Sequence, residues 1–324
     1  KTTLAFAVYR KLRGLSPKQP LPELGESRIE FSIGEHKALL IKDLSEQERN
    51  EHGKLMQNLL DGETRCLLVS NTGALLEFFL SQEDESRHVE LESLLLTSLS
   101  KERDDSFTFK GSHFKIYNLA LRDNLPLAEA VLDKMLATDL WEPCDACQYH
   151  TSCPVVFNRT LLDGKTCPAR QRLFLGYRRL QTYGTRLTMR QLSEHLAYCL
   201  TGGLDEHCLC NATNLSRKYK SYRLYNLFFG GPKAIPDSLV ADMAAIRAIH
   251  QQQLGIYPLP CVDKKLWHVL PTDGKTLGIP APVLSIFQSL IDQGSSQLDP
   301  HSADARLQAR RLLYFCADPS ARSI

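Results

Sequence analysis

The chain has 324 residues, of which 43% are apolar and 23% are charged. These fractions are close to those of ordinary globular domains, so they exclude a largely disordered chain and a fibrous rod. Lys and Arg together number 39 and Asp and Glu 37, so the formal net charge is only +2. The total charge therefore requires neither a nucleic acid nor an acidic membrane as partner, and the length predicts one or two domains.

Neither a membrane segment nor a secretion signal is visible in the sequence. No apolar run reaches the ~18 residues that a spanning helix requires, and the first thirty or so residues lack the apolar stretch of a signal peptide. We therefore expect a cytoplasmic protein without a membrane partner. Ten cysteines are many for a reducing compartment, which favours metal ligands over disulfides.

The first residues, Lys1-Thr2-Thr3, are followed by an amphipathic run to Leu12. A P-loop ends in Lys followed by Ser or Thr, and a helix begins there because its amides must face phosphate. On this interpretation Lys1 contacts the terminal phosphates of ATP, Thr2 binds Mg²⁺, and Thr3 lies beside them. The Gly-rich half of the motif would precede Lys1, so we expect the chain to be part of a longer protein. Lys-Thr-Thr also begins helices by chance, so the motif needs support from elsewhere.

A short apolar strand, predicted at 38–41, ends just before Asp43. It follows an alternating strand at 28–33 and a turn. A strand that ends in a carboxylate is typical of Walker B motifs, where the carboxylate binds Mg²⁺. Asp43 is the candidate ligand and Glu46 the candidate base that activates water. The alternative is that Ser45-x-x-Glu48 forms a capping box for the next helix and Asp43 only marks its entry.

A strand predicted at 66–70 is followed by Asn71-Thr72-Gly73 and a helix. In P-loop ATPases an Asn in this position orients the attacking water, whereas the same three residues also suit a simple turn from strand to helix. Another strand is predicted at 114–119. The alternation of strands and helices predicts a mainly parallel α/β sheet over residues 1–124.

Beyond residue 125 the periodicity indicates helices only. They are predicted at 125–138, 168–183, 188–201, 238–254, 281–293 and 302–316. The predicted fold is thus a P-loop NTPase core at 1–124, followed by a helical lid and C-terminal region at 125–324 that contains a Cys-rich insert at 141–168.

The Cys-rich insert has the spacing of a metal knuckle. Cys144, Cys147 and Cys153 form C-x2-C-x5-C, and Cys167 follows. Four thiolates suit a structural Zn²⁺ ion, and they suit a [4Fe–4S] cluster as well. We rank Cys167 above His150 as the fourth ligand. Ordinary thiols without a metal are the remaining alternative.

Basic residues without acidic neighbours lie between Asp163 and Glu194. Arg190 falls in the first turn of a helix with a Thr188-x-x-Gln191 capping box, where a lid arginine would sense the γ-phosphate. A solvated basic face is the alternative. A second stretch, 217–225, mixes basic and aromatic residues, which suits either a nucleic-acid strand or, as we favour, the core of the helical region.

Several short motifs recur in an order that resembles a known family. They are Lys-Thr-Thr at 1–3, Ile-Lys-Asp-Leu-Ser at 41–45, Leu-Val-Ser-Asn-Thr-Gly at 68–73, Tyr-Asn-Leu-Ala-Leu-Arg at 117–122, the Cys cluster, Arg-Leu-Thr-Met-Arg at 186–190, Leu-Thr-Gly-Gly at 200–203 and Arg-Arg-Leu-Leu-Tyr-Phe at 310–315. The chain resembles the large P-loop ATPases of bacterial anti-phage systems, in particular those of phosphorothioation-dependent DNA restriction. The resemblance implies ATP binding, an AAA-like core with a helical lid, and work on DNA or on other subunits of the defence system.

The motifs and the resemblance therefore predict an ATP-hydrolysing motor or switch subunit that uses Mg²⁺, and they leave open whether it forms a homo-oligomer. Two alternatives remain open. One is a zinc-stabilised regulator that binds DNA or protein without catalysis, and the other is a nucleic-acid enzyme with an iron–sulfur cluster.

Overall fold

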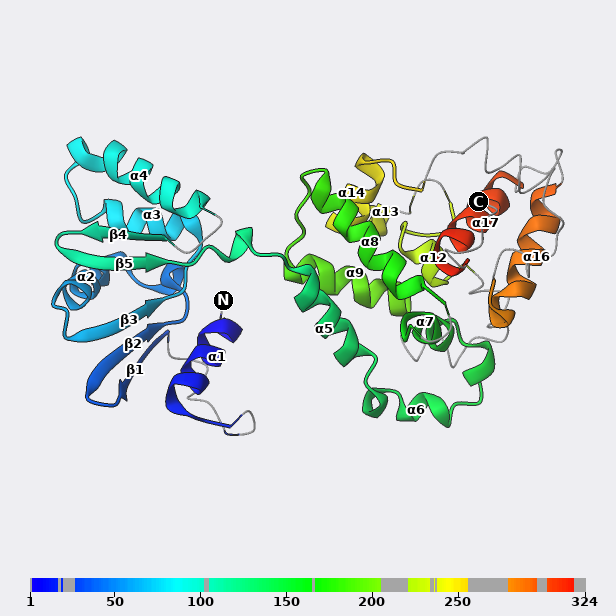
Figure 1. The fold of residues 1–324 in the computed structure, drawn as a ribbon, viewed down its shortest axis with the longest axis horizontal. Helices are drawn as coiled ribbons and strands as arrows, with labels where there is room; N and C mark the ends of the chain where they lie inside the picture. Colours follow the sequence, from blue (N-terminus) through cyan, green and yellow to red (C-terminus); the bar gives the residue numbers. More distant parts are fainter. Residues whose placement is uncertain are drawn as a thin grey trace. The chain divides into compact units, whose positions relative to one another are not determined.

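The computed structural model describes residues 2–16, 19, 27–101, 105–164, 167–204, 221–233, 236, 238–255, 279–295 and 302–317. The chain divides into two compact units, Lys1–Arg122 and Asp123–Ile324 (Figure 1). The sequence places the boundary after residue 124.

The first unit mixes helices and strands. In chain order its elements are α1 (Thr2–Arg13), β1 (Arg28–Ile33), β2 (His36–Ile41), η1 (Leu44–Glu46), η2 (Arg49–Glu51), α2 (His52–Leu60), β3 (Thr64–Leu68), α3 (Thr72–Leu80), α4 (Glu85–Ser100), β4 (Asp105–Phe109), β5 (Ser112–Ile116) and η3 (Leu119–Leu121).

The described strands form a mixed three-stranded sheet and a separate hairpin, not the mainly parallel sheet that the sequence predicts. In the sheet, β2 pairs antiparallel with β1 and parallel with β3. The β1–β2 connection is the two-residue turn Gly34-Glu35, with Gly34 at φ 60°, and so short a turn permits only antiparallel strands. The strand predicted at 114–119 is β5, which pairs antiparallel with β4.

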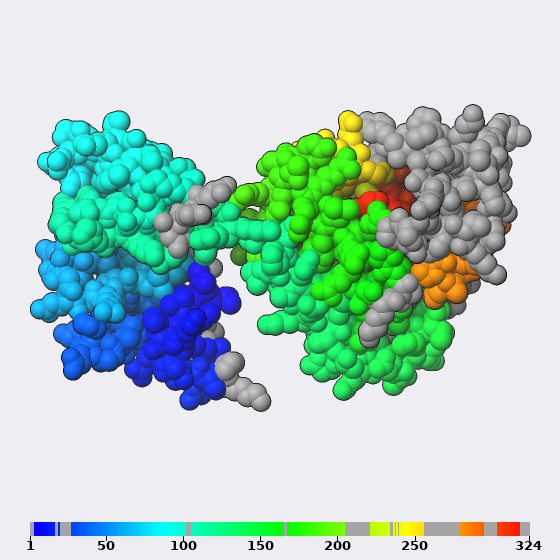
Figure 2. All heavy atoms as spheres, viewed as in Figure 1, coloured from blue at the N-terminus to red at the C-terminus, as the bar shows by residue number. Residues whose placement is uncertain are grey.

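Strand β2 is buried on both faces because helices cover both sides of the sheet. Leu40 and Ile29 pack with Phe6 of α1 on one face. Leu39 and Ile41 belong to a second cluster on the other face, together with side chains of α2, α3, α4 and the hairpin. Figure 2 shows α1, in dark blue, packed against the strands of this unit. Burial on both faces explains the unbroken apolar run of β2.

The second unit is helical throughout its described residues. Its elements are α5 (Leu125–Met135), η4 (Thr138–Leu140), α6 (Glu142–Asp145), η5 (His150–Ser152), α7 (Pro154–Leu162), α8 (Ala169–Thr182), α9 (Met189–Thr201), α12 (Leu224–Leu227), α13 (Ser238–Ala241), α14 (Ala244–Gln251), α16 (Ala281–Ser295) and α17 (Ser302–Cys316). The helices predicted beyond residue 125 are confirmed, with the one at 238–254 divided into α13 and α14.

One apolar core joins the helices of the second unit. It contains residues from α5, α7, α8, α9, α12, α14, α16 and α17. Its centre is aromatic, since the Phe228 ring lies 5.8 Å from the Tyr177 ring and 5.4 Å from the Phe315 ring. None of the helices that the structure describes is long and apolar enough to cross a membrane.

Candidate functional site

Asp43 and Asn71 follow the neighbouring parallel strands β2 and β3. The strand pairing continues past the ends of both, since Val69 N–H donates to Ile41 O at 3.0 Å and Leu44 N–H donates to Val69 O at 2.8 Å. These bonds hold the two chain segments that carry Asp43 and Asn71 side by side. The carboxyl ends of adjacent parallel strands are where α/β proteins commonly bind ligands.

The side chains of Asp43 and Asn71 both act as helix caps. Asp43 Oδ1 accepts hydrogen bonds from Ser45 N at 3.1 Å and Ser45 Oγ at 2.7 Å, at the start of η1. Asn71 Oδ1 accepts from Ala74 N at 2.7 Å, at the start of α3. These are the contacts expected of turn residues. Glu46 is exposed at the end of η1.

The alternative for this segment, a Ser45-x-x-Glu48 capping box that opens the next helix, is not seen. The segment begins as two short 3-10 helices, and α2 starts only at His52. Asp43, not Ser45, supplies the side-chain cap.

Helix α1 lies against the same end of the sheet. It begins at Thr2, and Thr3 is exposed on it. Lys1 and the side chain of Thr2 fall outside the described residues. Lys42 Nζ lies 5.6 Å from the centre of the Phe6 ring, and Phe6 packs in the cluster that also contains Val69. The N-terminal half of α1 is therefore beside the segments that follow β2 and β3.

The first three cysteines of the insert lie near one another. Burial raises the pKa of the Cys144 thiol, and the neighbouring thiols of Cys153 and Cys147 raise it further. The His150 ring is held by its Nδ1, which lies 2.7 Å from Cys144 O. Among the described residues, however, no three His, Cys, Asp or Glu side chains converge closely enough to hold a metal ion.

Cys167 contacts a different cysteine from those predicted. It is buried just before α8, close to Cys316 at the end of α17, and the two thiols change each other's pKa. The pKa of Cys167 is lowered and that of Cys316 is raised by this contact. Among the described residues, the four thiols of Cys144, Cys147, Cys153 and Cys167 are therefore not brought together as one metal-holding group.

The basic stretch is partly neutralised and partly exposed. Arg170 forms an ion pair with Asp133 at 2.6 Å, an acidic partner that is distant in sequence. Lys165 lies outside the described residues. The Thr188–Gln191 capping box of α9 is confirmed, and Arg190 is exposed in its first turn.

The aromatic residues at the end of the 217–225 stretch belong to the core. Residues 217–220 lie outside the described ones, but Tyr225 and nearby Phe228 are buried. Arg223 lies over the Phe157 ring at 5.1 Å. The core interpretation is therefore confirmed for the described part of this stretch.

A buried polar network on α9 was not predicted. The His195 ring is fully buried, with Nδ1 2.8 Å from Tyr177 Oη and Nε2 3.2 Å from Phe228 O. Because a carbonyl only accepts, Nε2 carries the proton and Nδ1 accepts from the tyrosine. Burial lowers the pKa of His195 to about 4. Only the apolar spacing of Leu192 and Leu196 around it could have indicated that this His faces the core.

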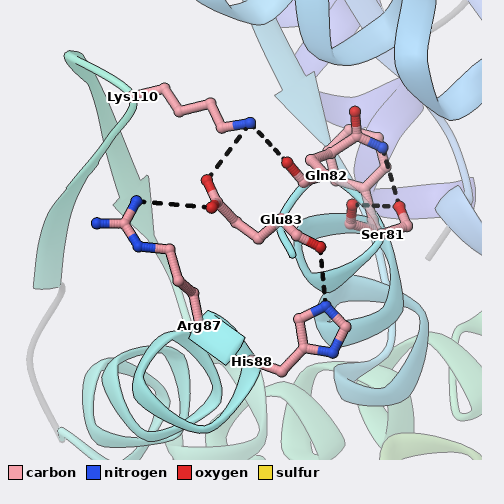
Figure 3. Close-up of polar contacts among 7 residues, drawn as sticks. Ser81, Gln82, Glu83, Arg87, His88 and Lys110 are labelled. Carbon is pink, nitrogen blue, oxygen red and sulfur yellow. Dashed lines mark hydrogen bonds and ion pairs between the residues drawn. The ribbon is translucent and has the colours of Figure 1, made fainter. Parts of the chain in front are cut away.

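A second unpredicted cluster surrounds Glu83 (Figure 3). Its carboxylate lies 3.4 Å from Lys110 Nζ and 3.7 Å from an Arg87 nitrogen, and its carbonyl oxygen lies 3.0 Å from His88 Nε2. Lys110 also donates to Gln82 O at 2.5 Å. These contacts fasten the β4–β5 turn to the α3–α4 connection, so the cluster is structural. In the sequence, only the four-residue spacing of Glu83 and Arg87 indicated part of this cluster.

In comparisons with known proteins, the chain matches no family model, no curated protein and no solved structure. The functional assignment therefore depends on the chain's own residues.

Proposed function

We propose that the chain belongs to an ATP-hydrolysing P-loop subunit of a bacterial DNA-restriction or anti-phage system. The observation that supports this most directly is the arrangement at the C-terminal ends of strands β2 and β3. Asp43 and Asn71 follow adjacent parallel strands, and the first turns of α1 lie beside the same strand ends. Helix N-termini beside such strand ends are suited to phosphate binding.

The proposed roles follow from the side-chain chemistry. Lys1 would balance the charge of the terminal phosphates, while the Thr2 hydroxyl and the Asp43 carboxylate offer the oxygen ligands that Mg²⁺ prefers. A bound Mg²⁺ would neutralise developing phosphate charge. Asn71 would orient water, with Glu46 as base. Catalysis of this kind is mainly positioning and charge neutralisation.

The test is ATP hydrolysis by the full-length protein with substitutions that spare the caps. Asp43→Asn keeps an oxygen for the Ser45 amide but removes the charge, and Asn71→Ser keeps a capping oxygen but removes the amide. We expect each variant to lose at least about a hundredfold in kcat, the lower range for loss of one polar catalytic group. Asp61→Asn, at an exposed aspartate that ends α2, is the control and should keep full activity.

A non-catalytic regulator is the competing function, and the two caps favour it. The hydrogen bonds from Ser45 to Asp43 and from Ala74 to Asn71 are those of structural turns, and exposed arginines on the second unit offer a surface for DNA or a partner protein. These arginines are Arg178, Arg179 and Arg190. Hydrolysis that is unchanged in both Asp43→Asn and Asn71→Ser would reject the ATPase assignment and leave this function.

A further inference from the structure

Four arginines gather where α8 ends and α9 begins. Arg178 and Arg179 lie near the end of α8, Arg186 lies in the connection to α9, and Arg190 lies in the first turn of α9. All four are exposed. Residues 164–193 contain neither Asp nor Glu, so this part of the chain supplies no carboxylate that could neutralise them.

Carboxylates from other segments neutralise the four arginines only in part. The pKa of Asp123 is lowered by a backbone hydrogen bond and also by the nearby charges of Arg178 and Arg186, so one carboxylate faces these two. Among the described residues, no carboxylate forms an ion pair with Arg179 or Arg190. The surface therefore keeps an excess of positive charge.

The helix dipole explains the position of some of these arginines but not of all. A cation near the C-terminal end of a helix is stabilised by the dipole, which accounts for Arg178 and Arg179 at the end of α8. Arg190 lies at the opposite kind of end, where the dipole disfavours a positive charge, and the first turn of α9 contains no acidic residue. A bound anion would compensate this unfavourable placement.

An exposed aromatic ring lies among the arginines. Tyr183 directly follows α8 and is 61% exposed, and the Arg179 guanidinium lies 5.7 Å from the centre of its ring. The turn after Tyr183 is held in place, because Thr185 N–H donates to Leu180 O at 2.9 Å and Gln252 Nε2 donates to Thr185 Oγ1 at 3.0 Å. The ring and the cations are thus presented together by a well-anchored turn.

We propose that this surface, formed by Arg178, Arg179, Tyr183, Arg186 and Arg190, binds a single-stranded nucleic acid. The arginines neutralise phosphates, and the Tyr183 ring stacks on an unpaired base. A duplex hides the faces of its bases, so the exposed ring favours a single strand. The proposal names the partner of the exposed arginines on which the competing function above rests, and it does not depend on the ATPase assignment.

The test measures the fluorescence anisotropy of a labelled oligothymidylate with the full chain, in the absence of ATP and Mg²⁺. Tyr183→Leu should weaken binding at least about fivefold, which is the lower range for the loss of one stacked base. Tyr183→Phe keeps the ring and is the matched control, so its affinity should stay within about twofold of that of the unaltered chain.

The arginines have their own readout in the dependence on salt. Each phosphate contact to a single strand contributes about 0.7 to the slope of log affinity against log salt concentration. The double variant Arg178→Gln, Arg190→Gln should therefore lower this slope by about 1.4 and weaken binding. Arg65→Gln, at an exposed arginine of β3 in the first unit, is the control and should change neither quantity. Circular dichroism should show the same thermal transition in all variants, because every substituted side chain is exposed.

Three outcomes would overturn the proposal. The first is that the unaltered chain does not bind oligothymidylate, or that the arginine and tyrosine variants bind it equally well. The second is that a duplex of the same length binds as tightly and is insensitive to Tyr183→Leu. The third is that polyglutamate at the same charge concentration displaces the oligonucleotide, which would make an acidic protein segment the partner. None of these measurements involves ATP, so this test and that of the ATPase function fail independently.

Discussion

Asn158 is a buried polar side chain of α7 whose loss we expect to destabilise the second unit strongly. It is fully buried, and its Nδ2 donates to Leu200 O and to Tyr222 O, both at 3.0 Å. Its Oδ1 accepts from Leu224 N at 2.7 Å. One side chain thus satisfies three backbone groups from two segments, the end of α9 and residues 222–224.

We predict that Asn158→Ala lowers the free energy of unfolding by about 2–4 kcal/mol, because three buried backbone groups lose their partners at once. Urea denaturation followed by tryptophan fluorescence measures the change. Thr160→Ala is the matched control on the same helix, since Thr160 is exposed and its hydroxyl bonds only within α7. It should cost less than about 0.5 kcal/mol. Equal costs for the two variants would contradict this role of Asn158.

His195 gives the protein a specific dependence on pH. Its pKa falls to about 4 in the folded state, below the usual value of 6.5, because burial disfavours the charged ring. Between these values the unfolded chain binds a proton that the folded chain does not. The folded state therefore loses stability as the pH falls from about 6.5 to 4, and the contribution is fully present only above about 6.5.

The fall in the pKa of His195 from 6.5 to about 4 corresponds to about 3 kcal/mol, at 1.36 kcal/mol per pKa unit. We predict that His195→Gln removes up to this amount from the change in unfolding free energy between pH 6.5 and pH 4. The measurement is urea denaturation at pH 7.5 and at pH 4.5 for both proteins. Parallel losses in the two proteins would show that other groups control the acid sensitivity.

At the scale of elements, Gly176 sets how closely α8 approaches the aromatic core. A Cβ atom at this position would lie 2.6 Å from Phe228 Cζ, nearer than any carbon contact allows. The fully buried Phe228 ring has rings of Tyr177, His195, Phe229 and Phe315 around it and has little room to yield.

We predict that Gly176→Ala destabilises the protein by about 1–3 kcal/mol, since overpacking outweighs the gain in helix propensity. Gly53→Ala is the opposing control, because Gly53 is exposed in α2 with no atom within 4 Å of an added Cβ. That variant should be neutral or stabilising by up to about 1 kcal/mol. Combining Gly176→Ala with Phe228→Leu should lessen the cost of the first substitution; an additive loss would locate the strain elsewhere.

Elements with strong local periodicity were predictable from the sequence, and contacts between distant segments were not. Helices α5, α8, α9, α16 and α17 follow their apolar spacing, and β1 follows its alternation. Strand β4 was missed although Phe107 and Phe109 alternate before the Lys110-Gly111 turn. The pairing of β4 with β5, and the closeness of Cys167 to Cys316, are decided by packing across the fold, which spacing along the chain does not encode.

In the candidate site, too, local features were predictable from the sequence and contacts between distant segments were not. The motif at Asp43 and Asn71 correctly indicated polar residues at the ends of strands, because an apolar run followed by a polar turn is a local signal. The alternative given for each residue, a turn that enters the next helix, agrees with the caps that both side chains form. The Cys spacing likewise indicated thiols that lie near one another, but it gave no sign that Cys167 lies close to Cys316 at the end of α17.

At the scale of the whole molecule, each unit has its own core. The clusters around Phe79 and around Phe6 contain only residues of the first unit, and the large cluster around Phe228 contains only residues of the second. A separate core is what allows a domain to fold by itself. The chain also carries a built-in probe for this, since both tryptophans, Trp141 and Trp267, belong to the second unit.

We predict that the two units unfold independently. Phe79 is 2% exposed, and the Phe78, Phe107, Phe109 and Phe114 rings surround it, so Phe79→Ala should cost about 3–5 kcal/mol in the first unit. In urea the circular dichroism transition should then separate into two steps, while the tryptophan fluorescence midpoint stays unchanged. The reciprocal variant Leu196→Ala, in the second core, should lower the fluorescence midpoint and leave the first unit's step in place. A fluorescence midpoint that falls with Phe79→Ala would mean that the two cores unfold as one cooperative structure, because only energetic coupling can carry a loss in the first core to tryptophans in the second.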